Sequence, residues 1–240
     1  MARDRFQLTA DALGASARRV QDGEDFHHWA RGVLRGVLPH QALLCGQMVR
    51  HSGGFTALQR CSVDVPDAYL EPLERPGNNL STPMLKRLLQ APDQPHFFDP
   101  LRDADWGRTH PAWYAHYLQA AWRNSLVLGH VVGVGDDVVL TAATFYNVDP
   151  ALEAQASDLR RAVMQPLHAA LCSWYAASQA TGFTKAEEAI ASLLKQGKST
   201  KEIAKQLGKS DHTVKHQISA MLRKFEVGSR AELVSGFGGL

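Results

Sequence analysis

The sequence predicts two domains: an α+β domain, in which helices flank an antiparallel sheet, and a smaller all-α domain of four helices. The first is predicted by two apolar segments, residues 42–63 and 125–146, each of which is divided by a turn and has the pattern of a hairpin. The second is predicted by residues 184–234, where helix-start and helix-stop signals alternate closely. We place the domains at residues 1–178 and 184–240, joined by a linker at 179–183.

The first domain begins with a helix and a hairpin. Residues 26–38 are predicted to be helical because their apolar side chains recur every three or four positions. Residues 42–49 and 55–63 then have the composition of strands, on either side of a turn at Ser52-Gly53-Gly54.

Short helices in Pro- and Gly-rich loops separate the two hairpins. We expect helices at residues 67–73 and 83–90, with Ser81 as N-cap of the second, and a short strand at residues 96–98. A further helix is expected over residues 111–122, because Pro111 suits a first helical turn.

The second hairpin is followed by a long helix. Its strands are predicted at residues 125–134 and 138–146, with a tight Gly-Asp-Asp turn at residues 135–137. The helix, over residues 150–177, leads into the second domain.

Three capping boxes mark helix starts in the second domain. In each, a hydroxyl stands three residues before a carboxylate, so that the pair can satisfy backbone amides at a helix N-terminus. Gly197 and Gly208 are expected to end the first two helices, and Ser210 to cap a third that runs to Lys224. The boxes are Thr184 with Glu187, Ser199 with Glu202, and Ser229 with Glu232.

The third of these helices is apolar on one side and polar on the other. A B-DNA major groove admits one helix, and its base edges accept hydrogen bonds from Lys, His or Ser side chains. The pattern therefore predicts a recognition helix. The apolar stripe contains Val214, Ile218, Met221, Leu222 and Phe225. The opposite face contains His212, Lys215, His216, Ser219 and Arg223.

These residues resemble the helix-turn-helix domain of bacterial LuxR-type (NarL/FixJ) transcription regulators. The resemblance implies that the second and third helices form the helix-turn-helix and that the fourth, from Ser229, takes part in a dimer contact. The residues that carry it are Phe183-Thr184, Glu187, Gly197, Lys201-Glu202-Ile203-Ala204, Leu207-Gly208, Ser210, Thr213-Val214-Lys215, Leu222-Arg223-Lys224 and Ser229-Arg230-Ala231-Glu232-Leu233.

The resemblance also assigns contacts by position. Lys215, His216 and Ser219 would face bases. Lys201, Thr213 and Arg223 would touch phosphates, which position a protein without reading sequence.

The sequence departs from the family pattern in three respects. His216 and Ser219 are uncommon at base-reading positions, which bears on the target sequence and not on DNA binding itself. Lys209 replaces an aliphatic residue, so either its stem lies along the core or the turn is rearranged. Glu226 replaces a small residue at the end of the recognition helix, where a left-handed conformation would be strained, so Gly228 is expected to end that helix instead.

The order of elements in the first domain resembles that of GAF- and PAS-like sensor domains. It also resembles the ligand-binding domain of quorum-sensing LuxR proteins, which has an Asp-Pro followed by a Trp, as Asp99-Pro100 and Trp106 are here. The Trp and Tyr that line the acyl-lactone pocket in those receptors have no counterpart within residues 85–98. A closer likeness in layout is to LuxR-type regulators associated with exopolysaccharide biosynthesis.

Aromatic residues of the first domain have two interpretations. Trp106, Trp113 and Tyr117 either line a pocket for a small molecule or pack a helix onto the sheet. The sequence has no nucleophile elbow and no phosphate-binding glycine loop, so we expect neither catalysis nor a cofactor. His27 and His28 diverge on a helix, and the other His residues lack ligand spacing, so we expect no metal site.

Composition agrees with a DNA-binding protein. The whole chain has 26 Lys and Arg against 24 Asp and Glu, but residues 184–240 hold ten against six, so the basic excess is local. No apolar run is long enough to cross a membrane, and we expect the cytoplasm. Cys45, Cys61 and Cys172 are interpreted as reduced core residues.

The sequence therefore predicts a dimeric transcription regulator that binds double-stranded DNA through helix 211–224. Its further partners would be RNA polymerase and, as an open question, a small-molecule effector. Two alternatives remain: an acyl-homoserine-lactone receptor, and a GAF-like interaction module whose helix-turn-helix does not bind DNA.

Overall fold

The computed structural model divides into two compact units, Met1–Tyr175 and Ala176–Leu240, which we describe separately. The residues that the structure describes are 11–51, 54–74, 82–134, 137–180, 182–225 and 227–236.

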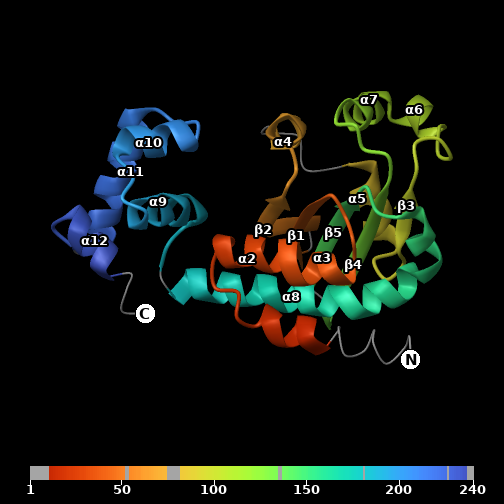
Figure 1. The fold of residues 1–240 in the computed structure, drawn as a ribbon, viewed down its shortest axis with the longest axis horizontal. Coiled ribbons are helices and arrows are strands. Elements are labelled where there is room, and N and C mark those ends of the chain that lie inside the picture. The colour runs from red at the N-terminus through yellow and green to blue at the C-terminus, as the bar shows by residue number, and fades with distance from the viewer. Residues whose placement is uncertain are drawn as a thin grey trace. The chain divides into compact units, whose positions relative to one another are not determined.

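Among the described residues, five antiparallel strands form a sheet in the first unit (Figure 1). The order is β2-β1-β5-β4-β3, so that β1 pairs with β5, which is far away in the sequence. The strands are β1 Ala42–His51, β2 Gly54–Val63, β3 His96–Phe98, β4 Ser125–Val134 and β5 Asp137–Tyr146. Both predicted hairpins and the short strand are confirmed. The turn residues 52–53 and 135–136 lie outside the described residues.

Helices α2 and α8 cover one face of the sheet (Figure 1). The predicted helix 26–38 begins earlier, because Asp22 caps it by accepting a 2.8 Å hydrogen bond from the amide of Asp25. Residues 11–17 form a helix that the sequence analysis did not foresee. The helical segments here are α2 Gly23–Trp29, the π-helical turn η1 Ala30–Leu34, α3 Arg35–Val37, the 3-10 helix η2 Pro150–Gln155 and α8 Ala156–Ala180.

The core on this face is apolar over most of its length and includes Cys45 and Cys61, as predicted. Cys172 of α8 was predicted to lie in the core as well, and this was wrong: the residue is exposed, although its sulfur lies 3.3 Å from Nε2 of the buried Gln47. α8 also extends to Ala180, two residues into the expected linker.

In the described part of the chain, four short helices cover the opposite face of the sheet (Figure 1). The second, α5, is capped by Thr82, which accepts a 3.1 Å hydrogen bond from the amide of Leu85. The predicted cap, Ser81, lies outside the described residues. The helix predicted to reach Trp122 ends at Gln119, because Ala121 adopts a left-handed conformation with φ 58°. The helices are α4 Asp67–Glu74, α5 Pro83–Gln90, α6 Trp106–Thr109 and α7 Pro111–Gln119.

The described part of the second unit contains the four predicted helices after the end of α8. They enclose a separate core in which Ile190, Ile203, Val214 and Met221 are buried. The helices are α9 Lys185–Lys195, α10 Thr200–Gln206, α11 Asp211–Lys224 and α12 Arg230–Gly236.

Candidate nucleic-acid interface

Reciprocal hydrogen bonds start helices α9 and α10. The amide of Thr184 donates to Glu187 Oε2 at 2.7 Å, and the amide of Glu187 donates back to Thr184 Oγ1 at 3.3 Å. Ser199 and Glu202 repeat this pattern with the same two distances. Both capping boxes are confirmed. Hydrogen bonds from Ser199 hold the pKa of Glu202 below its usual value, so this carboxylate stays charged at neutral pH.

The turn between α10 and α11 is tight. Gly208 has a φ of 62°, and the amide of Lys209 closes the end of α10 by donating to the carbonyl of Ala204 at 2.9 Å. Lys209 is half-buried, and its Nζ donates to Gln217 Oε1 of α11 at 3.1 Å. The Lys209 ammonium is therefore hydrogen-bonded across the turn while its stem is partly covered, which agrees with the expectation that the stem lies along the core.

Helix α11 begins at its predicted cap, since Ser210 Oγ accepts a 3.0 Å hydrogen bond from the amide of Thr213. Val214, Ile218 and Met221 of its apolar stripe are buried. This packing fixes the rotation of the helix about its axis, so its polar side faces solvent.

The six predicted contact residues fall into three groups. Lys215 and His216 are exposed on α11. Ser219, one turn further along the helix, is half-buried and therefore less exposed than these two residues. The three predicted phosphate contacts are all exposed: Lys201 on α10, and Thr213 and Arg223 on α11. The Thr213 hydroxyl lies 2.7 Å from the Ser210 hydroxyl. The structure thus places a row of donors on the solvent side of the predicted helix-turn-helix.

The end of α11 differs from the prediction. The amide of Val227 donates to the carbonyl of Leu222 at 3.0 Å, so the helix is closed before Gly228 is reached. Gly228 therefore does not end α11, and Glu226 lies outside the described residues. Instead, the amide of Gly228 donates to Glu232 Oε2 at 2.9 Å, at the start of α12. The amide of Glu232 in turn donates to Ser229 Oγ at 3.2 Å, as the third capping box predicted.

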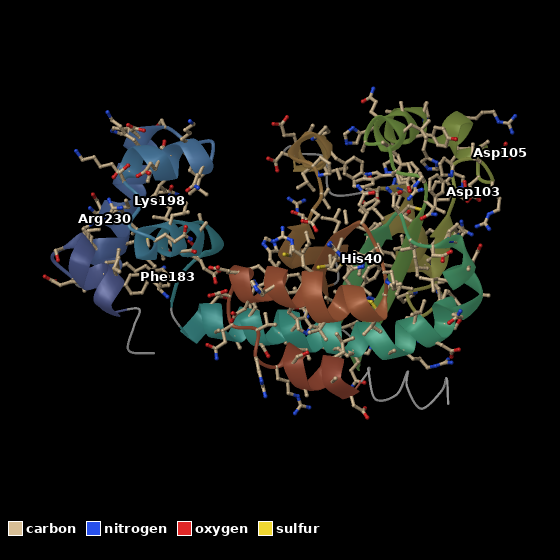
Figure 2. The ribbon with its side chains drawn as sticks, viewed as in Figure 1. His40, Asp103, Asp105, Phe183, Lys198 and Arg230 are labelled. Atoms are coloured by element: carbon tan, nitrogen blue, oxygen red, sulfur yellow. The ribbon has the colours of Figure 1, made fainter. Side chains whose placement is uncertain are left out.

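Two contacts that sequence reasoning missed hold α11 and α12 to the rest of the domain. Lys224 Nζ at the end of α11 lies 2.7 Å from Glu187 Oε2 at the start of α9. Arg230 of α12 donates to the carbonyl of Lys198, and both residues are labelled in Figure 2. No sequence signal identifies these pairs, because each joins residues more than 30 positions apart.

Residues 181–236 match the family model described as bacterial regulatory proteins, luxR family. The C-terminal domain is a luxR-family helix-turn-helix domain. Its second and third helices are α10 and α11, and the luxR family is one of DNA-binding transcription regulators, not of enzymes. Comparison with curated proteins yields no match.

The fold of the chain resembles solved luxR-type structures. An N-acylhomoserine lactone dependent LuxR family transcription factor, CepR2 from Burkholderia cenocepacia, aligns with a TM-score of 0.54 and 11% identity, over 72% of this chain and 99% of that one. SdiA from Escherichia coli aligns with a TM-score of 0.47 and 15% identity, over 96% and 95% of the two chains. The likeness to CepR2 shows the shared fold of the luxR-type proteins.

The aromatic residues predicted to line a pocket lie together, Trp106 on α6 and Trp113 and Tyr117 on α7. The rings of Trp106, Trp113 and Tyr117 surround Phe98, with ring centroids 5.1, 5.2 and 5.0 Å from that of Phe98. Phe98 is fully buried on β3, so these rings pack the helices onto the sheet.

The same cluster contains polar atoms without hydrogen-bond partners among the described residues. Trp113 Nε1 and Trp122 Nε1 are two such buried atoms. Tyr117 OH and Ser125 Oγ are also buried, but they act on each other, since Ser125 opposes part of the effect of burial on the pKa of Tyr117. Burial raises the pKa of Tyr117 well above its usual value, so the phenol remains a neutral donor. The Asp99 side chain is not among these atoms without a partner, because its Oδ1 accepts a 2.8 Å hydrogen bond from the amide of Leu101.

Two further observations concern the described residues alone. They contain no group of three or more His, Cys, Asp or Glu side chains arranged to hold a metal ion. None of their helices is both long enough and apolar enough to cross a membrane.

Proposed function

We propose that this protein is a dimeric transcription regulator that recognises specific DNA sites by inserting α11 into the major groove. The observation that carries the proposal is the exposed row of donors on α11, held outward by the buried stripe of Val214, Ile218 and Met221. We propose residues 184–240 as the DNA-binding domain and residues 1–178 as a sensor or dimerisation domain.

The contact assignment follows from exposure and position. Lys215 and His216 are exposed donors on α11 and are assigned to base edges, together with the less exposed Ser219. Lys201, Thr213 and Arg223 are assigned to phosphates, on either side of the base-reading residues.

Dimerisation is proposed because two recognition helices related by a twofold axis would read half-sites about one helical turn apart. The family resemblance assigns α12 to this contact. The operator would then be a palindrome, or nearly one.

Fluorescence anisotropy of the full-length protein with labelled duplex DNA tests DNA binding. Phosphate contacts release counterions, so the binding constant should fall steeply as salt is raised. A variant with Lys201 and Arg223 both changed to Ala should bind more weakly and show a smaller salt slope. No binding to any duplex at low salt, by a protein shown to be folded, would instead favour an interaction module without DNA-binding activity.

A second candidate function is ligand binding in the aromatic cluster, which is favoured by the buried indole N–H groups of Trp113 and Trp122, for which the described residues offer no acceptor. Such atoms are costly to bury, and a ligand with hydrogen-bond acceptors would satisfy them. An acyl-homoserine lactone is one candidate for this ligand. Tryptophan fluorescence should report its binding directly, and Tyr117→Phe should weaken it. If none of a series of lactones changes the fluorescence, the cluster is better explained as packing alone.

Control of exopolysaccharide genes, contact with RNA polymerase and a cytoplasmic location are parts of the same proposal. They are supported by the family resemblance and the luxR-family domain, which implies that the protein acts on DNA. Mapping the bound promoters across the genome would identify the genes directly. A set without exopolysaccharide genes would exclude that assignment.

A further inference from the structure

A lysine and a glutamine meet at the turn between α10 and α11. Lys209 stands between Gly208 and Ser210, the cap of α11, and Gln217 lies in the second turn of that helix. Lys209 Nζ and Gln217 Oε1 are 3.1 Å apart. Both residues are half-buried, so each keeps part of its surface open to solvent. Neither is among the six residues assigned above to bases and phosphates.

The contact with Lys209 fixes the direction of the Gln217 amide. An ammonium group only donates hydrogen bonds, so the atom that faces it is the carbonyl oxygen of the amide and not the nitrogen. No acceptor among the described residues takes up the two N–H groups of Gln217 Nε2. The ammonium of Lys209 also keeps N–H groups to spare, because it has three and gives one to Gln217. The two side chains therefore offer a cationic donor and a neutral donor next to each other.

This pair of donors lies on a flank of α11 that is already assigned to the DNA backbone. Ser210, Thr213 and Gln217 are three and four positions apart, so they follow one another along one side of the helix. Thr213 is exposed and is one of the residues assigned to phosphates. The match of residues 181–236 to a family of DNA-binding regulators is an independent reason to expect a nucleic-acid backbone at this turn.

We propose that Lys209 and Gln217 together bind one backbone phosphate of the DNA. The inference rests on the proposed function, because it requires α11 to lie in the major groove. A phosphate is negatively charged and has only acceptor oxygens, which suits an ammonium and an amide N–H group. Lys209 supplies the charge, and it is also a positioning residue, because it holds the Gln217 amide with its N–H groups available. The departure of Lys209 from the family pattern then adds a DNA contact.

Methionine substitutions test this contact by fluorescence anisotropy across a salt series. The full-length protein is titrated into two duplexes, one selected for binding from a random pool and one unrelated to it. Lys209→Met should bind both about tenfold more weakly, and the slope of log K against log salt should fall by about 0.9, as for one lost phosphate contact. Gln217→Met should bind both about fivefold more weakly but leave the slope unchanged, because the amide is uncharged.

The double variant tests the positioning role of Lys209. Without Lys209 the amide is no longer oriented, so adding Gln217→Met to Lys209→Met should weaken binding by less than about twofold. Lys205→Met is the matched control, because Lys205 is an exposed lysine of α10 that makes no hydrogen bond to Gln217. It removes the same charge, and its effect should combine in full with that of Gln217→Met. Lys209→Arg keeps the charge and the donors and should retain the wild-type slope.

The outcomes separate this inference from the proposed function. A folded wild-type protein that binds no duplex at low salt would overturn both. Binding by the wild type, with unchanged affinity and slope in Lys209→Met, would overturn only the phosphate contact, and a lowered melting temperature in that variant would then assign Lys209 to the turn alone. Full additivity of Lys209→Met and Gln217→Met would overturn the positioning role. If Lys209→Met does not fold, Gln217→Met decides, and wild-type affinity in Gln217→Met would overturn the proposal.

Discussion

Glu187 takes part in two interactions, the capping box of α9 and an ion pair with Lys224 of α11. Its removal should therefore destabilise both helices. One carboxylate oxygen accepts the amide of Thr184 at 2.7 Å and also lies 2.7 Å from Lys224 Nζ. A capping interaction contributes about 1 kcal/mol. Because Lys224 is 38% exposed, the ion pair adds only about 0.2 to 1 kcal/mol after screening. Glu187→Ala should therefore cost about 1 to 2 kcal/mol.

Native-state hydrogen exchange followed by mass spectrometry measures this cost in the full-length chain. A loss of 1 to 2 kcal/mol should accelerate exchange in peptides from α9 and α11 by about 5 to 30 times. Glu187→Gln keeps a capping oxygen but removes the charge, so it should cost less free energy than Glu187→Ala. Lys224→Met removes the same ion pair, so it should accelerate exchange in α11 about as much as Glu187→Gln does. The reasoning fails if Glu187→Ala leaves exchange in α11 unchanged.

The same carboxylate makes this stability dependent on pH. Burial raises the pKa of Glu187, but hydrogen bonds from Lys224 and Thr184 outweigh burial and leave the pKa below the usual value. A group whose pKa is lowered by folding stabilises the fold above its unfolded pKa and loses that contribution as the pH falls through the folded value. Protection in α11 should therefore decline in acid, and in Glu187→Gln the decline should be smaller.

Three further predictions concern other parts of the chain. Ala121→Gly should raise the thermal stability by about 1 kcal/mol, because φ is 58° there; no increase in the melting temperature would contradict this. Gly129→Ala should cost about 1 to 3 kcal/mol, because its Cβ would lie 2.5 Å from the Pro92 carbonyl oxygen; an unchanged melting temperature would show that the loop yields freely. Lys215→Ala should cost about 1 to 3 kcal/mol on the cognate site and little on random DNA; equal losses on both would make it a phosphate contact.

Much of the fold could be predicted because its signals are local. A glycine turn between two β-branched segments specifies a hairpin, and a hydroxyl three residues before a carboxylate specifies a helix start, as Ser199 and Glu202 do. The buried side of α11 was predicted for the same reason, since the spacing from Val214 to Met221 indicates which side of the helix faces the core.

What could not be predicted depends on contacts between distant residues. The end of α7 at Gln119 is set by the backbone of Ala121, a residue whose type gives no warning of a left-handed conformation. Cys172 was assigned to the core from its residue type alone, whereas its surroundings are formed by β1 and by a neighbouring turn of its own helix. The partnership of Lys224 with Glu187 likewise exists only once α9 and α11 have packed.

The pairing of β1 with β5 has a consequence for how the chain folds. Each hairpin joins neighbouring strands and can form early, but the register that aligns Ala42 with Tyr146 must close a loop of about one hundred residues, with its entropic penalty. On a ribosome, the first hairpin would emerge long before its partner strand. Until β5 is synthesised, the inner edge of β1 has no strand to pair with, and this interval is when the nascent protein is most exposed to aggregation.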